Sequence, residues 1–77
     1  MEQTHTPAFR PAYMKKTALA LCYFPDAKPH TARQHLMRWI KSCPSLMHEL
    51  KALGYRNGQH FFTVSQVSLI TSYLSDP

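Results

Sequence analysis

Basic side chains without acidic neighbours are the part of this sequence whose types and spacing indicate chemistry. Residues 27–48 carry Lys28, Arg33, Arg38 and Lys41, and no Asp or Glu. Three histidines in the same stretch add positive charge below neutral pH. A patch of this sign suits an anionic partner, most often nucleic acid. The alternative is that these side chains form only the solvated face of a helix.

One helical face is predicted to contact duplex DNA. At 100° per residue, the positions opposite or flanking the apolar stripe of this segment are Arg33, Gln34, Arg38 and Lys41. Arginine pairs with guanine and glutamine with adenine in the major groove, whereas lysine mostly contacts phosphate. Lys15 and Lys16, at the start of an earlier helix, are predicted to add contacts to the DNA backbone. Their alternative role is to increase solubility.

Metal and catalytic chemistry are not expected. His30 and His35 are five residues apart, which misses the i, i+4 spacing of two ligands on one helical face. Cys22 and Cys43 have no close ligand neighbours, whereas a structural zinc needs four convergent ligands. The chain has no glycine-rich phosphate loop or carboxylate pair, and nothing activates Cys43 beside His48. We therefore expect no metal, no cofactor and no enzymatic activity.

The stretch from Met14 to Phe24 raises the alternative of a secreted protein. Two lysines precede an apolar run, but that run covers only residues 18–24 and stops at Pro25-Asp26. A secretory signal needs a longer apolar region and a small-residue cleavage site. No run approaches the ~18–20 apolar residues of a membrane span. We expect a cytoplasmic protein without membrane association, and an exported lipoprotein is a remote alternative.

The elements that position these residues are predicted to be helices of one compact all-α domain. The 77 residues suffice for a single small domain, and 44% hydrophobic with 12% aromatic residues favour a folded core over disorder. Residues 1–12, which include Pro7 and Pro11, are predicted to be a flexible N-terminal arm before a four-helix, helix-turn-helix-like domain at residues 13–77. The predicted helices are Lys15–Phe24, Thr31–Ser42, Pro44–Leu53 and Thr63–Leu74.

Local signals set the predicted helix ends. Thr31 with Gln34 and Thr63 with Gln66 are predicted to form capping boxes at the starts of two helices. Thr17 is predicted to cap the first helix, and Pro44 suits the first position of the third. Gly54 is predicted to stop the third helix in a left-handed conformation, with Tyr55 packing back onto Leu50. Asn57-Gly58 is a turn signal, so residues 55–62 form either a plain loop or a very short hairpin.

Apolar residues at helical spacing define the predicted core. Its members are Leu19, Leu36, Trp39, Ile40, Leu50, Val67, Ile70 and Leu74. Trp39 is interpreted as a core anchor, and base stacking is the alternative role for its ring. Cys22 and Cys43 fall on core faces, so they are interpreted as small buried hydrophobic residues.

Short motifs spread over Lys16–Pro77 resemble those of a known family. They are Leu19-Ala20, residues 23–26, Leu36, residues 38–40, Cys43-Pro44, Leu46, Leu50, Gly54-Tyr55, Phe62-Thr63 and residues 66–70. In these the chain is similar to a family of short proteins from Bacteroides and relatives that carries a domain-of-unknown-function label. The resemblance implies a small intracellular bacterial protein and brings no activity with it.

A looser resemblance concerns the first two predicted helices. Leu19-Ala20 followed by the capped segment Thr31–Ile40 is similar to helix-turn-helix modules of the MerR and excisionase kind. This similarity implies DNA binding through the second helix, as a small regulator or a mobile-element accessory factor. The connection at residues 24–30 departs from the family pattern, because such turns usually contain three or four residues.

The sequence is therefore compatible with two functions. The first is binding of double-stranded DNA through the Thr31–Lys41 helix, which requires its basic face to be exposed. The alternative is a protein-interaction module without nucleic-acid binding, which forms a homodimer or docks on another protein. It would use the surface aromatics Tyr13, Tyr55, Phe61 and Tyr73 and requires a contiguous exposed apolar patch.

Overall fold

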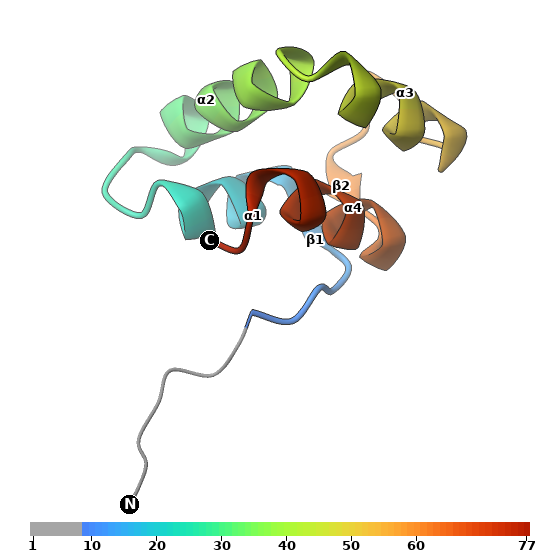
Figure 1. Cartoon of the computed structure of the whole chain (residues 1–77). Helices are drawn as coiled ribbons and strands as arrows, with labels where there is room; N and C mark the ends of the chain where they lie inside the picture. Colours follow the sequence, from blue (N-terminus) through green and yellow to red (C-terminus); the bar gives the residue numbers. More distant parts are fainter. Residues whose placement is uncertain (1–8) are drawn as a thin grey trace, which may run out of the picture.

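The computed structural model describes residues 9–77, which form four helices joined by short loops (Figure 1). The helices are α1 (Lys16–Tyr23), α2 (Pro29–Lys41), α3 (Pro44–Ala52) and α4 (Val64–Leu74). Two strands of two residues each, β1 (Met14–Lys15) and β2 (Phe61–Phe62), complete the fold. The predicted all-α, four-helix domain is confirmed, and every helix boundary lies within two residues of its prediction.

The helices form two layers around one core. In Figure 1, α2 and α3 run along one side of the molecule, and α1, α4 and the strands lie on the other. The buried apolar residues between them are Leu19, Ala20, Ala32, Leu36, Ile40, Leu46, Leu50, Tyr55, Phe62, Val67 and Ile70. The core residues of α2, α3 and α4 are spaced three or four apart, as in amphipathic helices, and α1 contributes the adjacent pair Leu19 and Ala20. The outer side of α2 is thereby left to solvent.

The strand pairing is long-range. β1 pairs antiparallel with β2, so that Met14 lies opposite Phe62 and Lys15 opposite Phe61. The sequence left two alternatives for residues 55–62, a plain loop or a very short hairpin in which residues 55–56 would pair with residues 59–62 across the Asn-Gly turn. Tyr55 instead packs in the core, where it is 5% exposed and its ring centroid lies 5.8 Å from that of Phe62, and residues 55–56 form no strand. β1, from the N-terminal part of the chain, is the strand that pairs with β2, and it leads directly into α1.

Two predicted N-terminal caps are wrong. α2 begins at Pro29, two residues before the predicted capping box of Thr31 and Gln34, so both residues lie inside the helix. Proline suits the first helical position because it lacks the N–H that would otherwise be unsatisfied there. Thr17 does not cap α1 either, since the helix starts one residue earlier, at Lys16, directly after β1.

The end of α3 is formed as predicted. Gly54 has a φ of +89°, in the left-handed region that glycine adopts without strain. Its N–H donates to the Lys51 carbonyl at 3.0 Å, and the N–H of Tyr55 donates to the Leu50 carbonyl at 3.0 Å. This pair of hydrogen bonds is a Schellman motif. It reverses the chain and directs Tyr55 back into the core cluster that contains Leu50.

The capping box of α4 is confirmed, and it has a wider role. The N–H of Gln66 donates to Thr63 Oγ1 at 3.2 Å, while the N–H of Thr63 donates to Gln66 Oε1 at 3.0 Å. Gln66 is only 1% exposed. Its Nε2 donates to the Leu53 carbonyl at 3.2 Å, and its Oε1 accepts from Gln59 Nε2 at 2.7 Å. One side chain therefore joins α4, the end of α3 and the loop before β2.

Trp39 departs from the predicted core. It was expected to be a core anchor, but 44% of it is exposed. The large fully buried aromatic ring is that of Phe62, which reaches the core through strand pairing. The core side of α2 is that of Ala32, Leu36 and Ile40, and Met37 packs half-buried against the core. The Trp39 ring packs at the surface instead, with centroid distances of 5.9 Å to Tyr23 and 5.1 Å to Phe24.

Three smaller core predictions also differ from the structure. Cys22 is exposed because Leu19 and Ala20 occupy the inward side of α1. Cys43 is half-buried at the junction of α2 and α3, and Leu74 is half-buried near the end of α4. Both half-buried residues pack against the core cluster.

Residues 1–8 of the predicted N-terminal arm lie outside the described residues. The described part of the arm has no helix or strand, and Phe9 is half-buried against the core cluster. Among the described residues, none of the helices combines the length and the apolar character needed to cross a bilayer.

Candidate anion-binding surface

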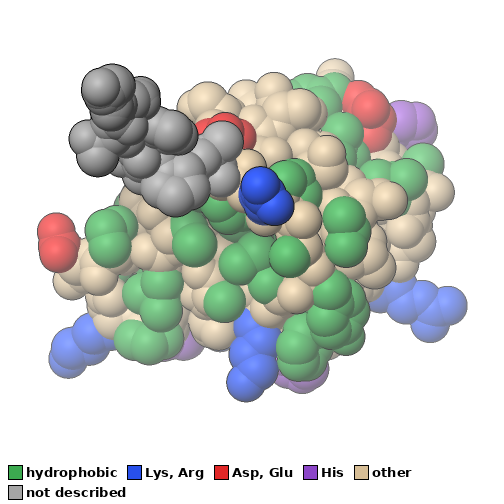
Figure 2. All heavy atoms as spheres, turned by 90° about the horizontal axis from the view of Figure 1, so that it is seen from below, with side chains coloured by type: hydrophobic (Ala, Val, Ile, Leu, Met, Phe, Trp, Pro, Cys, Tyr) green, Lys and Arg blue, Asp and Glu red, His purple; other side chains and the backbone are tan. Residues whose placement is uncertain are grey.

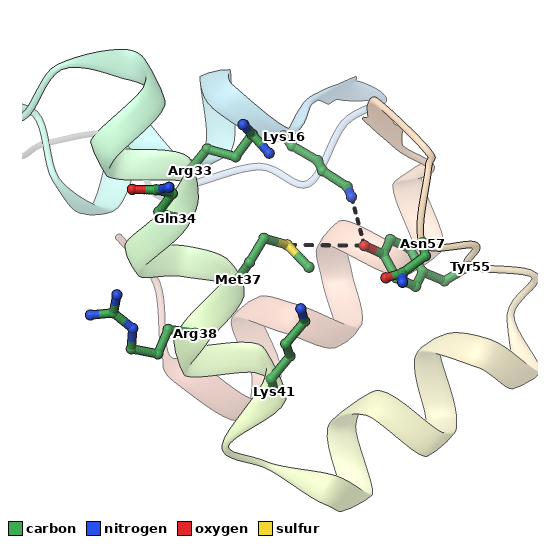
Figure 3. A pocket seen from close by; sticks show the side chains of 8 residues that line it. All are labelled: Lys16, Arg33, Gln34, Met37, Arg38, Lys41, Tyr55 and Asn57. Atoms are coloured by element: carbon green, nitrogen blue, oxygen red, sulfur yellow. Dashed lines mark hydrogen bonds between the residues drawn. The ribbon is translucent and has the colours of Figure 1, made fainter.

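A hollow of about 440 Å³ opens between α2, the start of α1 and the loop that follows α3 (Figure 3). We call it the basic hollow. Its lining residues are Lys16, Arg33, Gln34, Met37, Arg38, Lys41, Tyr55 and Asn57. Five of the six side chains that the sequence predicted for DNA contacts therefore lie around one opening.

The sixth predicted side chain, Lys15, lines an adjoining hollow of about 640 Å³ beside the strands. We call this one the strand hollow. It shares Lys16, Arg33 and Asn57 with the basic hollow, so the two are continuous. A third hollow shares Lys41 and extends past Lys51 of α3. Positive charge thus runs from β1 across α2 to α3.

The lining side chains do not all point the same way. In Figure 3, Lys16 and Lys41 extend into the space between α2 and the Tyr55 segment, and Arg33 reaches toward Lys16. Gln34 and Arg38 project from the other side of α2 and form the outer rim. Both rim residues are exposed. The predicted set therefore divides into cations that converge inside the hollow and polar groups that face outward.

Lys16 is buried, a placement that was not predicted and that contradicts its alternative role as a solubility residue. The residue is 6% exposed, and its Nζ donates to Tyr55 Oη at 2.6 Å. The ammonium also lies 4.8 Å from the ring centroid of Tyr55 and 5.8 Å from that of Phe62. A signal for this burial was present, because Lys16 precedes Leu19 and Ala20 by three and four residues on one helical face.

The electrostatics of the basic hollow are entirely cationic. Burial lowers the pKa of Lys16, and the positive charges of Arg33 and Lys41 lower it further. Among residues 9–77 the acidic side chains are Asp26, Glu49 and Asp76. None of these carboxylates lines either the basic hollow or the strand hollow. The surface is therefore suited to a negatively charged ligand.

Arg33 is held in place by its own helix. Its Nη2 lies 3.3 Å from Nδ1 of His30, one turn earlier in α2, within hydrogen-bond distance. Arg33 is half-buried, and it lines both the basic and the strand hollow. The guanidinium is thereby fixed at the junction of the two hollows.

Tyr55, Met37 and Asn57 are the parts of this surface that the sequence did not predict. Tyr55 was expected among the surface aromatics, and its 5% exposure corrects that prediction. Burial raises the pKa of the Tyr55 phenol, so its hydroxyl remains protonated at neutral pH. This hydroxyl accepts from Lys16 and points toward Met37 Sδ at 4.0 Å. The glycine stop before Tyr55 was the signal for its inward turn.

Exposed aromatic residues lie outside the basic hollow. Tyr13, 62% exposed, stacks on Phe61 with a centroid distance of 5.0 Å, and both border a hollow with Leu53. Figure 2 shows the face opposite α2 and α3, where hydrophobic side chains are scattered among neutral ones and Lys or Arg stand mostly at the edge. The apolar patch lies outside the basic hollow but adjoins the strand hollow, because Phe61 lines both the strand hollow and the hollow beside Leu53.

In the part of the chain that the structure describes, no three His, Cys, Asp or Glu side chains converge on a point that could hold a metal ion.

A family model described as "Domain of unknown function (DUF4248)" matches residues 12–77. This match confirms the resemblance to a domain-of-unknown-function family that the sequence motifs indicated. No curated protein and no solved structure matches the chain.

Proposed function

The chain belongs to the DUF4248 family, and we propose that it is a DNA-binding protein whose α2 contacts the duplex. One observation carries this proposal: the six polar side chains selected from the sequence line two continuous hollows into which no described carboxylate points. Lysine and arginine neutralise phosphates and release condensed counterions, which drives DNA binding. A small regulator or a mobile-element accessory factor in the cytoplasm is the corresponding biological role.

The exposed rim of α2 supports base contacts. Gln34 and Arg38 face solvent on the side away from the core, so neither would need to leave a packing partner to enter a groove. Arginine and glutamine are the side chains that read guanine and adenine bidentately. Lys41, Arg33 and Lys16 lie behind them, where they suit the phosphate backbone.

The connection between α1 and α2 is closer to a helix-turn-helix turn than the sequence predicted. Because α2 starts at Pro29, the connection is residues 24–28 rather than residues 24–30. The chain reverses there, and α2 crosses back over α1 (Figure 1). This arrangement supports the similarity to MerR and excisionase modules, in which the second helix of the pair enters the major groove.

Salt dependence is the primary test of this proposal. With about three phosphate contacts, the observed affinity should fall with a log–log slope of about −3, or roughly 50-fold between 50 and 200 mM salt. A lone domain should bind a mixed duplex at micromolar levels or more weakly. Fluorescence anisotropy with a labelled duplex at two salt concentrations measures both quantities.

Charge reversal on α2 separates a specific surface from the overall positive charge. Arg38→Glu should abolish the anisotropy change at low salt, because it places a carboxylate at the rim that meets DNA. Lys28→Glu is the matched control, since it makes the same charge change at an exposed residue that does not line the basic hollow. Equal losses for the two variants, or no duplex binding by the parent protein, would contradict the proposal.

An apolar patch favours protein interaction as the second candidate. Tyr13 and Leu53 are 62% and 45% exposed, and they flank Phe61 on one side of the molecule. Such a cluster suits a homodimer or another protein, although an interface needs several hundred Å² of it. Sedimentation equilibrium of the parent and Tyr13→Ser tests this candidate. A dimer that dissociates in the variant, without duplex binding by the parent, would favour it over DNA binding.

A further inference from the structure

Lys16 is a buried cation, and among residues 9–77 no carboxylate lines the two hollows that it borders. Its recorded hydrogen-bond acceptor is the neutral Tyr55 hydroxyl, and its other close partners are the rings of Tyr55 and Phe62. The described carboxylates lie elsewhere. Glu49 accepts a hydrogen bond from Tyr73, the charge of Asp76 raises the pKa of Tyr23, and Asp26 borders a hollow near Phe24.

A buried charge normally has a counter-ion, because removal of an ion from water costs several kcal/mol. Aromatic faces and one hydrogen bond compensate only part of that cost. Two further cations, Arg33 and Lys41, line the same hollow and repel the ammonium, which lowers its pKa. The folded protein therefore holds three positive groups around a space that an anion would stabilise.

We propose that Lys16, Arg33 and Lys41 form a binding subsite for a single phosphate group on the floor of the basic hollow. This inference deepens the proposed function and rests on it for the source of the group, which is then a backbone phosphate of DNA. Free phosphate has the same chemistry, and the experiment below distinguishes the two sources.

The geometry of the subsite supplies donors beyond the three cations. Lys16 Nζ carries three N–H donors, and Tyr55 Oη is the acceptor recorded for one of them. The hydroxyl hydrogen of Tyr55 points at the Met37 thioether at 4.0 Å, a weak acceptor that a phosphate oxygen readily replaces. Asn57 adds a side-chain amide at the edge. Each of these groups can donate to an oxyanion without leaving another strong partner.

The hollow also has the required size. Its volume of about 440 Å³ corresponds to the share of roughly fifteen liquid waters, at about 30 Å³ each. A phosphate with its attached sugar fits this space. Lys16 also lines the strand hollow, which contains Lys15. A DNA strand with one phosphate at the subsite therefore has a further cation, Lys15, available for its next phosphate.

The test compares Lys16→Met with Lys28→Met, which removes the same charge from an exposed residue that does not line the basic hollow. Each protein is titrated with sodium phosphate, and with sodium chloride at equal ionic strength, while backbone amide shifts are followed by NMR. For the parent and Lys28→Met we expect saturable shifts at Tyr55 and Asn57 with phosphate only. Lys16→Met should show no saturable shifts there.

Lys41→Met provides a variant that cannot fail by unfolding the core, since Lys41 is exposed. It should weaken phosphate binding at least several-fold. Duplex binding is measured in parallel by anisotropy. Loss of one phosphate contact in Lys16→Met should reduce the salt slope by about 0.9, whereas Lys28→Met should leave the slope unchanged.

The outcomes separate this subsite from the proposed function. Phosphate binding that requires Lys16, without any duplex binding, supports the subsite with free phosphate as its source and contradicts the DNA proposal. A Lys16-dependent duplex slope without free-phosphate shifts supports a backbone phosphate as the source. If Lys16→Met and Lys41→Met, both folded by their NMR spectra, bind phosphate and duplex like the parent, the subsite is wrong whatever the status of DNA binding.

Discussion

Lys16 Nζ donates to Tyr55 Oη at 2.6 Å, a hydrogen bond between residues 39 positions apart in the chain. It joins the first turn of α1 to the segment that follows α3, and both of these elements border the basic hollow. The bond therefore fixes the shape of the hollow as well as the position of its most buried cation.

Tyr55→Phe tests the stabilising effect of this bond. The ring packing is retained, while Lys16 loses the acceptor recorded for its buried ammonium. A hydrogen bond to a charged group contributes about 1.5–3 kcal/mol, so we expect the free energy of unfolding to fall by about 2 kcal/mol. Urea denaturation followed by circular dichroism measures the change. Tyr13→Phe is the control, because Tyr13 is exposed and should lose almost nothing.

The ionisation of Lys16 should make the stability depend on pH in the alkaline range. Its pKa in the folded state is lowered, by burial first, from the ordinary value of 10.5. Between the lowered pKa and 10.5 the unfolded chain binds more protons than the folded protein, so this group makes stability rise with pH in that window. Below the window the charged ammonium is present in both states and weakens the fold.

The measurement is the difference in unfolding free energy between the parent and Lys16→Met, since other titrating groups cancel in it. The stability of the parent relative to the variant should increase as pH rises through the lowered pKa of Lys16 toward 10.5. At neutral pH, Lys16→Met should be as stable as the parent or more so, because a buried charge is removed. A difference that stays constant with pH would show that the Lys16 pKa is not lowered.

Tyr23 should titrate well above the ordinary pKa of a tyrosine, which is 10.0. Burial, then the charges of Asp76 and Cys22, raise the pKa of its phenol to about 12, and its hydroxyl donates to the Ser75 carbonyl at 2.5 Å. Stability from this group is complete below pH 10 and is lost as pH rises toward 12, since the unfolded chain ionises first. Tyrosinate absorbance should lose a component near pH 12 in Tyr23→Phe, and the alkaline loss of stability should be smaller.

Trp39→Ala should be milder than a core truncation. With 44% of the residue exposed, its ring buries only part of its area against Tyr23 and Phe24. We expect a loss of about 2 kcal/mol, where full burial of a tryptophan gives about 3–5 kcal/mol. Leu36→Ala on the same helix is the comparison, since Leu36 is fully buried and should cost about 3–4 kcal/mol. A Trp39→Ala variant less stable than Leu36→Ala would place the indole in the core.

The helices were predictable because their signals are local. Apolar spacing, Pro44 at the start of α3, the Gly54 stop and the Thr63–Gln66 capping box each act within a few residues, and the structure forms all of them. The errors in local prediction are also local in origin. Pro29 competes with Thr31 as the start of α2, and the proline prevails because its missing N–H needs no acceptor.

The sequence could predict which residues of α2 belong to the candidate site, but it could not predict the shape of the hollow that they line. Charge and helical phase selected Arg33, Gln34, Arg38 and Lys41 on one face, and these positions line the basic hollow. Neither signal could identify the opposite wall, because Tyr55 and Asn57 are uncharged residues of the loop that follows α3.

The sequence by itself determined where the helices form, which residues carry the positive charge and which glycine and capping box end the elements, since these depend on neighbours one turn away. Only the tertiary structure decided that Phe62 rather than Trp39 fills the core, and that Lys16 is buried against Tyr55. Both results depend on the pairing of two short strands, Met14–Lys15 and Phe61–Phe62, that lie far apart in the sequence. Such a pairing is stabilised by the core that it closes, and no local pattern encodes it.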